Sequence, residues 1–206
     1  MAIPSKQIGW SNESNLLYEL IRQMDKLQCE MCNVVRGPEG PVGPQGPAGT
    51  IADNYYGSFI SIIDQTSTAG VAKAMEYEVT DLSNGVSIVN NLLAKPTRIT
   101  FANTGVYNVQ FSAQLHNTDG GGSSVHTDIW LAVDGSPVAN SATKVSVTPN
   151  TPYVVAAWNF FINATAGQYA ELIWQPSITG LIIEQEPAAG GVPAIPSVIL
   201  TANRIG

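Results

Sequence analysis

Glycine recurs at every third position over residues 37–49, where the sequence reads GPEGPVGPQGPAG. The periodic residues are Gly37, Gly40, Gly43, Gly46 and Gly49, and proline follows each of the first four. In a collagen triple helix, three polyproline-II chains crowd a common axis at which only glycine fits. The period therefore predicts a short collagen-like triple helix, and with it a homotrimer. The alternative is a proline-rich linker in the polyproline-II conformation.

A heptad pattern of apolar residues precedes the glycine run. It predicts one helix over residues 11–34, which Ser11 or Asn12 can cap. Heptad a and d positions form the contacts of a coiled coil, so we expect them to be a trimerisation seam. The seam residues are Leu17, Leu20, Met24, Leu27 and Met31. The alternative is an amphipathic helix packed on another domain. A collagen-like run of this length is too short to hold three chains together alone and needs trimerisation at its flanks. We therefore favour the coiled coil.

The rest of the chain carries the pattern of a mainly β domain. Apolar runs of strand length are separated by turn sequences such as Asn84-Gly85 and Asp134-Gly135. Many short strands without a helical pattern predict a sandwich or a barrel. The expected strands are 58–64, 71–79, 86–90, 97–102, 106–116, 125–133, 138–147, 152–163, 168–175, 179–185 and 197–205.

The clearest of these strands covers residues 106–115, where apolar and polar residues alternate. Its apolar face is expected to enter the core and comprises Tyr107, Val109, Phe111, Ala113 and Leu115. The opposite face has no charge and comprises Asn108, Gln110, Ser112 and Gln114. Such a face is compatible both with packing against neighbouring protomers and with solvent exposure.

Charge and hydropathy exclude several classes of partner. The 206-residue chain has a formal net charge of -7, and only 12% of its residues are charged. An acidic chain lacks the basic surface of a nucleic-acid binder and is repelled by anionic lipid. No apolar run approaches the ~20 residues that span a bilayer, and the N-terminus does not read as a signal peptide. We therefore expect no nucleic-acid partner, no membrane insertion and synthesis in a cytoplasm.

Motifs that carry chemistry are lacking. The sequence contains no G-x-S-x-G, P-loop or H-E-x-x-H pattern, and its carboxylates are scattered singly. His116 and His126, with Asp119 and Asp128, could surround a metal, but their spacing matches no ligand pattern. We expect no enzyme activity, no catalytic residue, no metal and no cofactor.

Cysteine and tryptophan leave alternatives open. Cys29 and Cys32 form a C-x-x-C pair that could link chains ahead of the glycine run, bind metal in a trimer, or be free thiols. Redox catalysis is not expected, because no strand surrounds the pair. Trp130, Trp158 and Trp174 lie on three different expected strands. They are expected in the core or an interface, with sugar stacking as the alternative.

Three segments carry a resemblance to a known family. They are ITFANTGVYNVQF (99–111), GQYAELIW (167–174) and PSVIL (196–200). Behind a collagen-like stretch, this order resembles the C1q/TNF-like domains. The resemblance implies a jelly-roll β-sandwich that trimerises. Some C1q-like heads bind calcium, so the resemblance also makes Ca²⁺ on the acidic surface an alternative to the expected absence of metal. It divides the chain into an N-terminal segment (1–36), a collagen-like stalk (37–49) and a sandwich head (50–206).

The segment IGWSNESNLL (8–17) resembles the start of many tailed-phage structural proteins, in which a short helix anchors to the virion. The resemblance implies a homotrimeric virion fibre that contacts other virion proteins through its N-terminus. Animal C1q-like proteins carry signal peptides, and this chain departs from them there. The alternatives are a capsid decoration or head-fibre protein without a receptor role, and a bacterial spore-surface collagen-like protein.

The expected receptor surface lies in loops, the usual place for binding on a rigid sandwich. Loop 117–125 (NTDGGGSSV) is small and polar, and loop 187–196 (PAAGGVPAIP) is apolar. The residues expected to contact a host-surface glycan are Asn117, Asp119, Ser123, Ser124 and His126. Threefold display would add avidity to weak contacts. The alternative is that these loops are plain connections.

Overall fold

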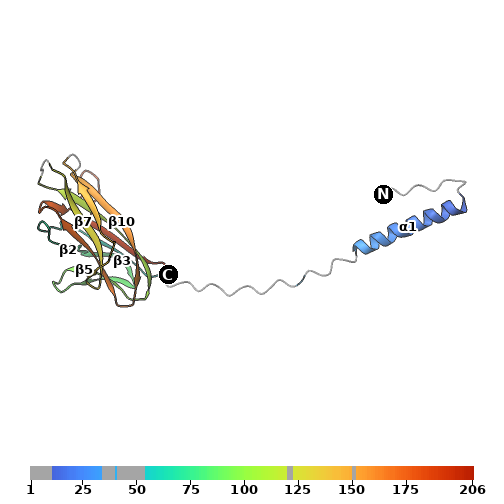
Figure 1. The fold of residues 1–206 in the computed structure, drawn as a ribbon, viewed down its shortest axis with the longest axis horizontal. Coiled ribbons are helices and arrows are strands. Elements are labelled where there is room, and N and C mark those ends of the chain that lie inside the picture. Colours follow the sequence, from blue (N-terminus) through green and yellow to red (C-terminus); the bar gives the residue numbers. More distant parts are fainter. Residues whose placement is uncertain (1–10, 34–39, 41–53, 120–122, 150–151) are drawn as a thin grey trace. The chain divides into compact units, whose positions relative to one another are not determined.

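A computed structural model describes residues 11–33, 40, 54–119, 123–149 and 152–206 (Figure 1). The chain divides into two units, residues 1–50 and 51–206. Among the glycines of the expected stalk, only Gly40 lies within the described part of the chain. Gly37, Gly43, Gly46 and Gly49 lie outside it, so the collagen-like triple helix stays a prediction.

The first unit contains helix α1 (Asn12–Asn33), as the heptad pattern predicts. Ser11 caps it, because its Oγ accepts a 3.3 Å hydrogen bond from the backbone N–H of Ser14. The seam of α1 is uncovered in the single chain. Its five residues are between 54% and 68% exposed: Leu17, Leu20, Met24, Leu27 and Met31. No helix of the described residues is long and apolar enough to cross a membrane.

The second unit, the head, consists of strands. They are β1 (Tyr56–Ser61), β2 (Lys73–Ala74), β3 (Val79–Asn84), β4 (Val86–Asn90), β5 (Pro96–Phe101), β6 (Gly105–Asn117), β7 (Val125–Val133), β8 (Ser136–Pro137), β9 (Thr143–Val147), β10 (Tyr153–Ala164), β11 (Tyr169–Pro176), β12 (Leu181–Ile183) and β13 (Val198–Arg204). The mainly β prediction is confirmed.

These strands form two sheets. The first has the order β10-β6-β13-β1-β3, and β12 also pairs with β6. The second has the order β4-β5-β11-β7-β8, with β2 paired to β11 and β9 to β7. All pairings between named strands are antiparallel. The fold is therefore a sandwich of two antiparallel sheets, consistent with the expected jelly roll.

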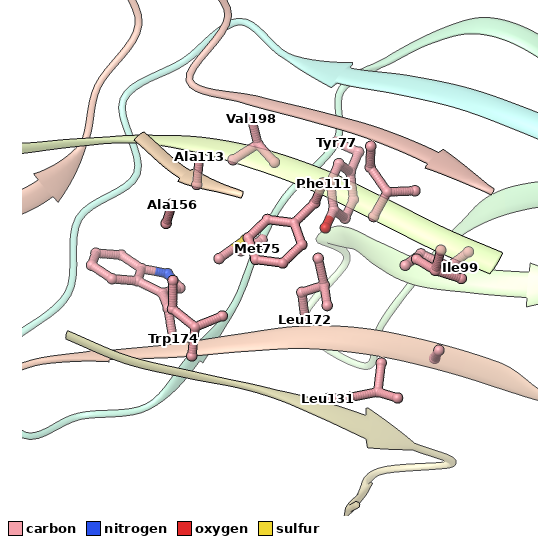
Figure 2. Close-up of a cluster of buried hydrophobic side chains, with 14 of the residues drawn as sticks. Met75, Tyr77, Ile99, Phe111, Ala113, Leu131, Ala156, Leu172, Trp174 and Val198 are labelled. Carbon is pink, nitrogen blue, oxygen red and sulfur yellow. The ribbon is translucent and has the colours of Figure 1, made fainter. Parts of the chain in front are cut away.

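Strand β6 organises the first sheet, because it pairs with β10 from Gly105 to His116 and with β13 on its other side. Its apolar face is buried as predicted, at Tyr107, Val109, Phe111, Ala113 and Leu115. Opposite this face, β11 contributes Leu172 and Trp174, which are fully buried. Figure 2 shows part of the core between the sheets, in which Met75 and Tyr77 join these side chains. Strand alternation thus builds the core from both layers.

Two expected strands are wrong in extent. The run 71–79 contains the short β2, and its last residue, Val79, begins the strand β3 (Val79–Asn84). Strand β3 is an edge strand with mostly exposed residues, so it lacks the alternation that marks a half-buried strand. The run 138–147 is interrupted by a turn in which Asn140 has a φ of 63°. Only β9 remains of it, preceded by the short β8.

The described head begins and ends at one end of the sandwich. The N–H of Arg204 donates to the carbonyl of Tyr55 (2.8 Å), and the N–H of Val106 donates to the carbonyl of Gly206 (2.9 Å). At the other end of β6, the N–H of Thr118 donates to the carbonyl of Gly180 (2.9 Å). A strand of 13 residues spans about 40 Å. The loops that follow β6 and β11 therefore lie at the distal end of the head, far from residue 55.

Candidate association face and distal loops

The outward side of the first sheet carries a continuous uncharged surface. Strands β10, β6 and β13 run in register there, with Phe161 opposite Asn108 and Ile199 opposite Ser112. We call this surface the association face; it comprises Asn108, Gln110, Ser112, Gln114, Tyr153, Val155, Ala157, Asn159, Phe161, Ile199, Thr201 and Asn203. It includes the whole polar face that the sequence predicts for residues 106–115.

Large apolar side chains stand on the association face beside amides and hydroxyls. Phe161 is 66% exposed, Val155 55% and Tyr153 52%. A hollow of about 210 Å³ lies at the middle of the face, lined by Gln110, Phe111, Ser112, Ile199 and Thr201. Exposed aromatic and aliphatic side chains without charged neighbours are typical of the core of a protein interface.

A close polar contact between His116 and Glu184 marks the distal border of the association face. The Nδ1 atom of His116 lies 2.8 Å from Oε2 of Glu184, and the His116 ring stacks on Tyr153 with centroids 4.0 Å apart. Desolvation, together with the carboxylates of Glu184 and Glu186, raises the pKa of the Tyr153 phenol above its usual value. The carboxylates of Glu184 and Glu186 thus lie at the edge of the face, near Tyr153.

The five residues expected to contact a receptor have different environments. Asn117 is only 5% exposed, and its Oδ1 accepts a 3.2 Å hydrogen bond from the N–H of Asp119, so its side chain shapes the base of the loop. Asp119, Ser123 and Ser124 are exposed, whereas His126 is half-buried on β7. Residues 120–122 lie outside the described residues. Receptor contact by this loop stays a prediction.

The groups considered for metal binding are not assembled into a cluster. Among the described residues there is no group of three or more His, Cys, Asp or Glu side chains that could hold a metal ion. Asp128 instead pairs with Lys144, whose Nζ lies 3.3 Å from its Oδ1. His116 is engaged with Glu184, as described above.

The cysteines and tryptophans divide between surface and core. Cys29 is an exposed free thiol on α1, and Cys32 lies in the same helix. Trp174 is fully buried, and Trp158 packs on the core through Phe111. Trp130 lies on the outward side of the second sheet, because its neighbours Ile129 and Leu131 on β7 are buried in the core. Trp174 and Trp158 therefore belong to the core, one of the two predicted locations, and Trp130 does not. The placement of Trp130 in an interface stays a prediction.

Comparison with known proteins gives a structural likeness only. No protein-family model and no curated protein matches the chain. Among solved structures, it is similar to murine APRIL at pH 8.5, with a TM-score of 0.46 and 8% identity over 74% of this chain and 99% of that one. A structure of murine APRIL at pH 5.0 gives the same TM-score and coverage at 9% identity.

Proposed function

We propose that this chain is the subunit of a homotrimeric, non-enzymatic fibre of a phage virion. Residues 1–36 anchor the fibre to other virion proteins, residues 37–49 form the stalk, and residues 50–206 form a projecting head that attaches to host-surface glycan. The observation that carries the proposal is the association face, an uncharged surface with exposed Phe161, Val155 and Tyr153. In the proposed trimer, a second and a third copy of the chain cover the association face.

Energetics support self-association through this face. Burying a large apolar side chain contributes about 1.5–3 kcal/mol, and the association face offers several such side chains. Because no charged residue lies within the face, association there has no large cost of ion desolvation. The exposed seam of α1 offers a second apolar surface on the same chain. The glycine period of residues 37–49 supports three chains as the number.

The placement in a virion is supported by the resemblance of residues 8–17 to tailed-phage structural proteins. The geometry of the head is compatible with it, since the loops after β6 and β11 lie at the end opposite to Tyr55. A protein that attaches through such loops needs its connection at the other end. We propose synthesis in the host cytoplasm followed by incorporation into the particle.

Native mass measured by light scattering tests the trimer. Three chains of 21.8 kDa give about 65 kDa, and this is the expected result. A monomer of 21.8 kDa would contradict the trimer and the stalk together. Gold-labelled antibody against the head then tests the location, with labelled phage particles as the expected result. Labelled particles whose purified head does not bind host cells would indicate a decoration protein.

A further inference from the structure

A pocket of about 250 Å³ lies on the outward side of the second sheet, a different surface from the association face. We call it the flank pocket. Strands β2, β7, β8 and β11 and their turns contribute its lining residues: Ala72, Lys73, Ala74, Trp130, Ala132, Gly135, Pro137, Glu171 and Ile173. Trp130 and Glu171 give this pocket an aromatic surface and a carboxylate.

Strand register explains why the pocket exists. Ile173 on β11 lies opposite Ala74 on one side and opposite Trp130 on the other. In the next row, Ala132 lies opposite both Glu171 and Pro137. Alanine at two of these positions leaves space above the sheet that larger side chains would fill. The small side chains of Ala74 and Ala132 therefore account for the hollow.

Glu171 is a buried acceptor in this pocket. It is 8% exposed, and its Oε1 accepts a hydrogen bond from the hydroxyl of Thr97. This bond restrains the carboxylate, which has further lone pairs to offer to a donor in the pocket. A buried carboxylate forms strong hydrogen bonds with hydroxyl donors, because its local dielectric is low.

We propose that the flank pocket binds one sugar unit of a neutral glycan. A sugar ring has an apolar C–H face and a rim of hydroxyl groups. The indole of Trp130 supplies a flat apolar surface for the C–H face of the sugar. The carboxylate of Glu171 accepts hydrogen bonds from its hydroxyl groups. The pocket is small for a larger ligand, since pockets for drug-sized molecules begin at about 300 Å³.

Electrostatics select a neutral sugar over an anionic one. The pocket is lined by one cation, Lys73, and one anion, Glu171, so its charges balance. The chain as a whole has a net charge of -7, which disfavours an anionic sugar. Glu171 is also the sole carboxylate among the described residues that line the pocket. Glycoside hydrolysis ordinarily uses a pair of carboxylates about 5–10 Å apart, so the pocket is built to bind and not to cleave.

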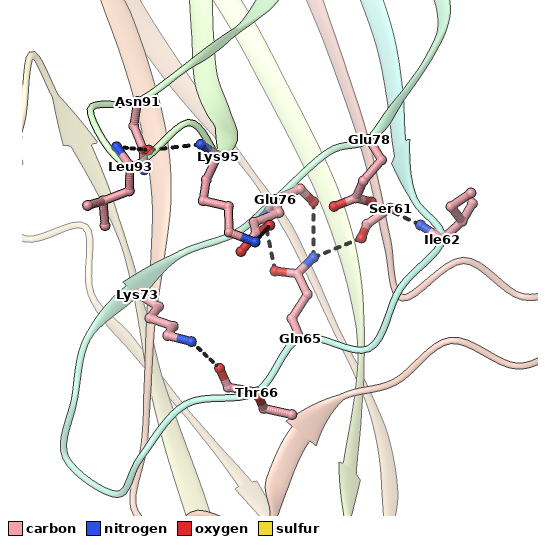
Figure 3. A network of polar contacts seen from close by, with 10 residues as sticks. All are labelled: Ser61, Ile62, Gln65, Thr66, Lys73, Glu76, Glu78, Asn91, Leu93 and Lys95. Atoms are coloured by element: carbon pink, nitrogen blue, oxygen red, sulfur yellow. Dashed lines mark hydrogen bonds and ion pairs between the residues drawn. The ribbon is translucent and has the colours of Figure 1, made fainter.

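One wall of the pocket is held in place by a polar network (Figure 3). Gln65 donates from Nε2 to Ser61 Oγ and to the Glu76 carbonyl, both at 3.0 Å, and accepts from the Glu76 N–H at Oε1. Lys73 donates from Nζ to the carbonyl of Thr66 (2.7 Å). These bonds fix the segment that carries Ala72, Lys73 and Ala74. A pre-formed wall lowers the ordering cost of binding.

The inference deepens the proposed attachment function and rests on it for its biological role. It places glycan recognition on the flank of the head, through Trp130 and Glu171, in addition to the distal loops. A trimer would carry three such pockets. Weak binding at each pocket would then give strong attachment to a repetitive surface polymer.

The test uses full-length protein labelled with 5-fluorotryptophan, which gives four fluorine resonances for its four tryptophans. Single tryptophan-to-phenylalanine variants assign them. The probes are D-glucose, D-galactose, D-mannose, L-rhamnose and N-acetyl-D-glucosamine, each titrated to saturation or to its solubility limit. We expect at least one sugar to shift the Trp130 resonance saturably while the Trp174 resonance stays in place. A Trp130 resonance that none of these sugars moves would overturn the proposal.

Two variants and a control locate the site. Ala132→Leu fills the pocket without removing its polar groups, and we expect it to weaken the titration about tenfold or more. Glu171→Gln keeps the shape and removes the charge, and we expect a loss of about tenfold. Ser87→Ala, at an exposed position of strand β4 outside the pocket, should bind as the unaltered protein does. An Ala132→Leu variant that binds the sugar equally well would refute the assignment.

Adsorption to host cells separates this inference from the fibre proposal. If trimeric protein adsorbs and Ala132→Leu adsorbs equally, the pocket is not the attachment site while the fibre role stands. If the Trp130 shift is present and lost in Ala132→Leu, but antibody does not label phage particles, the pocket stands and the virion role fails.

Discussion

Phe111 on β6 and Trp158 on β10 are register partners on neighbouring strands of the first sheet, and their rings meet edge to face with centroids 4.7 Å apart. The planes are inclined at 75°. This geometry is the favoured one for aromatic pairs, since the positive edge of one ring meets the negative face of the other. The two rings connect the pairing of β6 with β10, the longest in the described head, to the hydrophobic core.

Removal of this contact should destabilise the head. We expect Phe111→Ala to lower the free energy of unfolding by about 3–5 kcal/mol, because it empties a buried aromatic site. A double-mutant cycle with Trp158→Ala should give a coupling of about 0.5–1.5 kcal/mol. Urea unfolding at fixed chain concentration measures both. Ser146→Ala on the exposed side of β9 is the control, expected within about 0.5 kcal/mol of the unaltered protein. A coupling near zero would mean that the ring geometry contributes nothing.

Alkaline pH should destabilise the head through Tyr77. Burial, and then the carboxylate of Glu171, raise the pKa of the Tyr77 phenol above its ordinary value of 10.0. A phenol whose pKa is raised by folding contributes stability that is complete below pH 10 and is lost as the pH rises further. We expect Tyr77→Phe to flatten the fall of the unfolding free energy above pH 10, as measured by urea titrations at a series of pH values.

At neutral pH, Tyr77→Phe is compared with Tyr107→Phe. Among the described residues Tyr77 Oη has no hydrogen-bond partner, so Tyr77→Phe should cost little at neutral pH. Tyr107 Oη donates a 2.9 Å hydrogen bond to the carbonyl of Asn103, and its loss should cost about 1 kcal/mol at neutral pH. Equal costs for the two variants at pH 7 would contradict this assignment.

Charge placed on the association face should prevent trimer formation by the head. We expect Gln110→Arg combined with Phe161→Arg to dissociate the head, because like charges would be buried together. The native mass of a head fragment (residues 54–206) reports the change. Ser146→Arg adds a charge on the second sheet and should leave the mass unchanged. A double variant that stays trimeric would place the interface elsewhere.

The stalk can be tested by a pair of arginine substitutions. Gly43→Arg puts a side chain at the axis of the proposed triple helix, where none fits, whereas Gln45→Arg lies at a position that faces outward. We expect only Gly43→Arg to lower the melting temperature of the polyproline-II circular dichroism signal. Equal melting of the two variants would support the plain linker.

Alternation was sufficient to predict the strands that have one buried face. The best example is β6, whose inward and outward residues are all assigned correctly from its sequence. Strand β3 could not be predicted in this way, since an edge strand with little burial has no alternation to detect. The turn at Asn140 was not predicted, because the residue types of the run 138–147 do not indicate that Asn140 adopts a φ of 63°.

The two surfaces differ in how far the sequence predicts them. The uncharged side of β6 was visible as a pattern, but its partners Val155 and Phe161 became neighbours only through the register of β10. The flank pocket was not predictable, because Trp130, Ala132 and Glu171 meet through a pairing between strands about 40 residues apart. The one available signal was Trp130, an aromatic residue on a strand whose apolar residues Ile129 and Leu131 face inward.

The position of β13 between β6 and β1 has a consequence for biosynthesis. This strand follows every other described strand of the head in the chain, yet it lies in the interior of the first sheet. Until β13 has been synthesised, β6 and β1 each present an open edge, and such edges invite pairing with other chains. A head with so many distant pairings also folds slowly. Nascent chains therefore need protection until β13 has emerged from the ribosome.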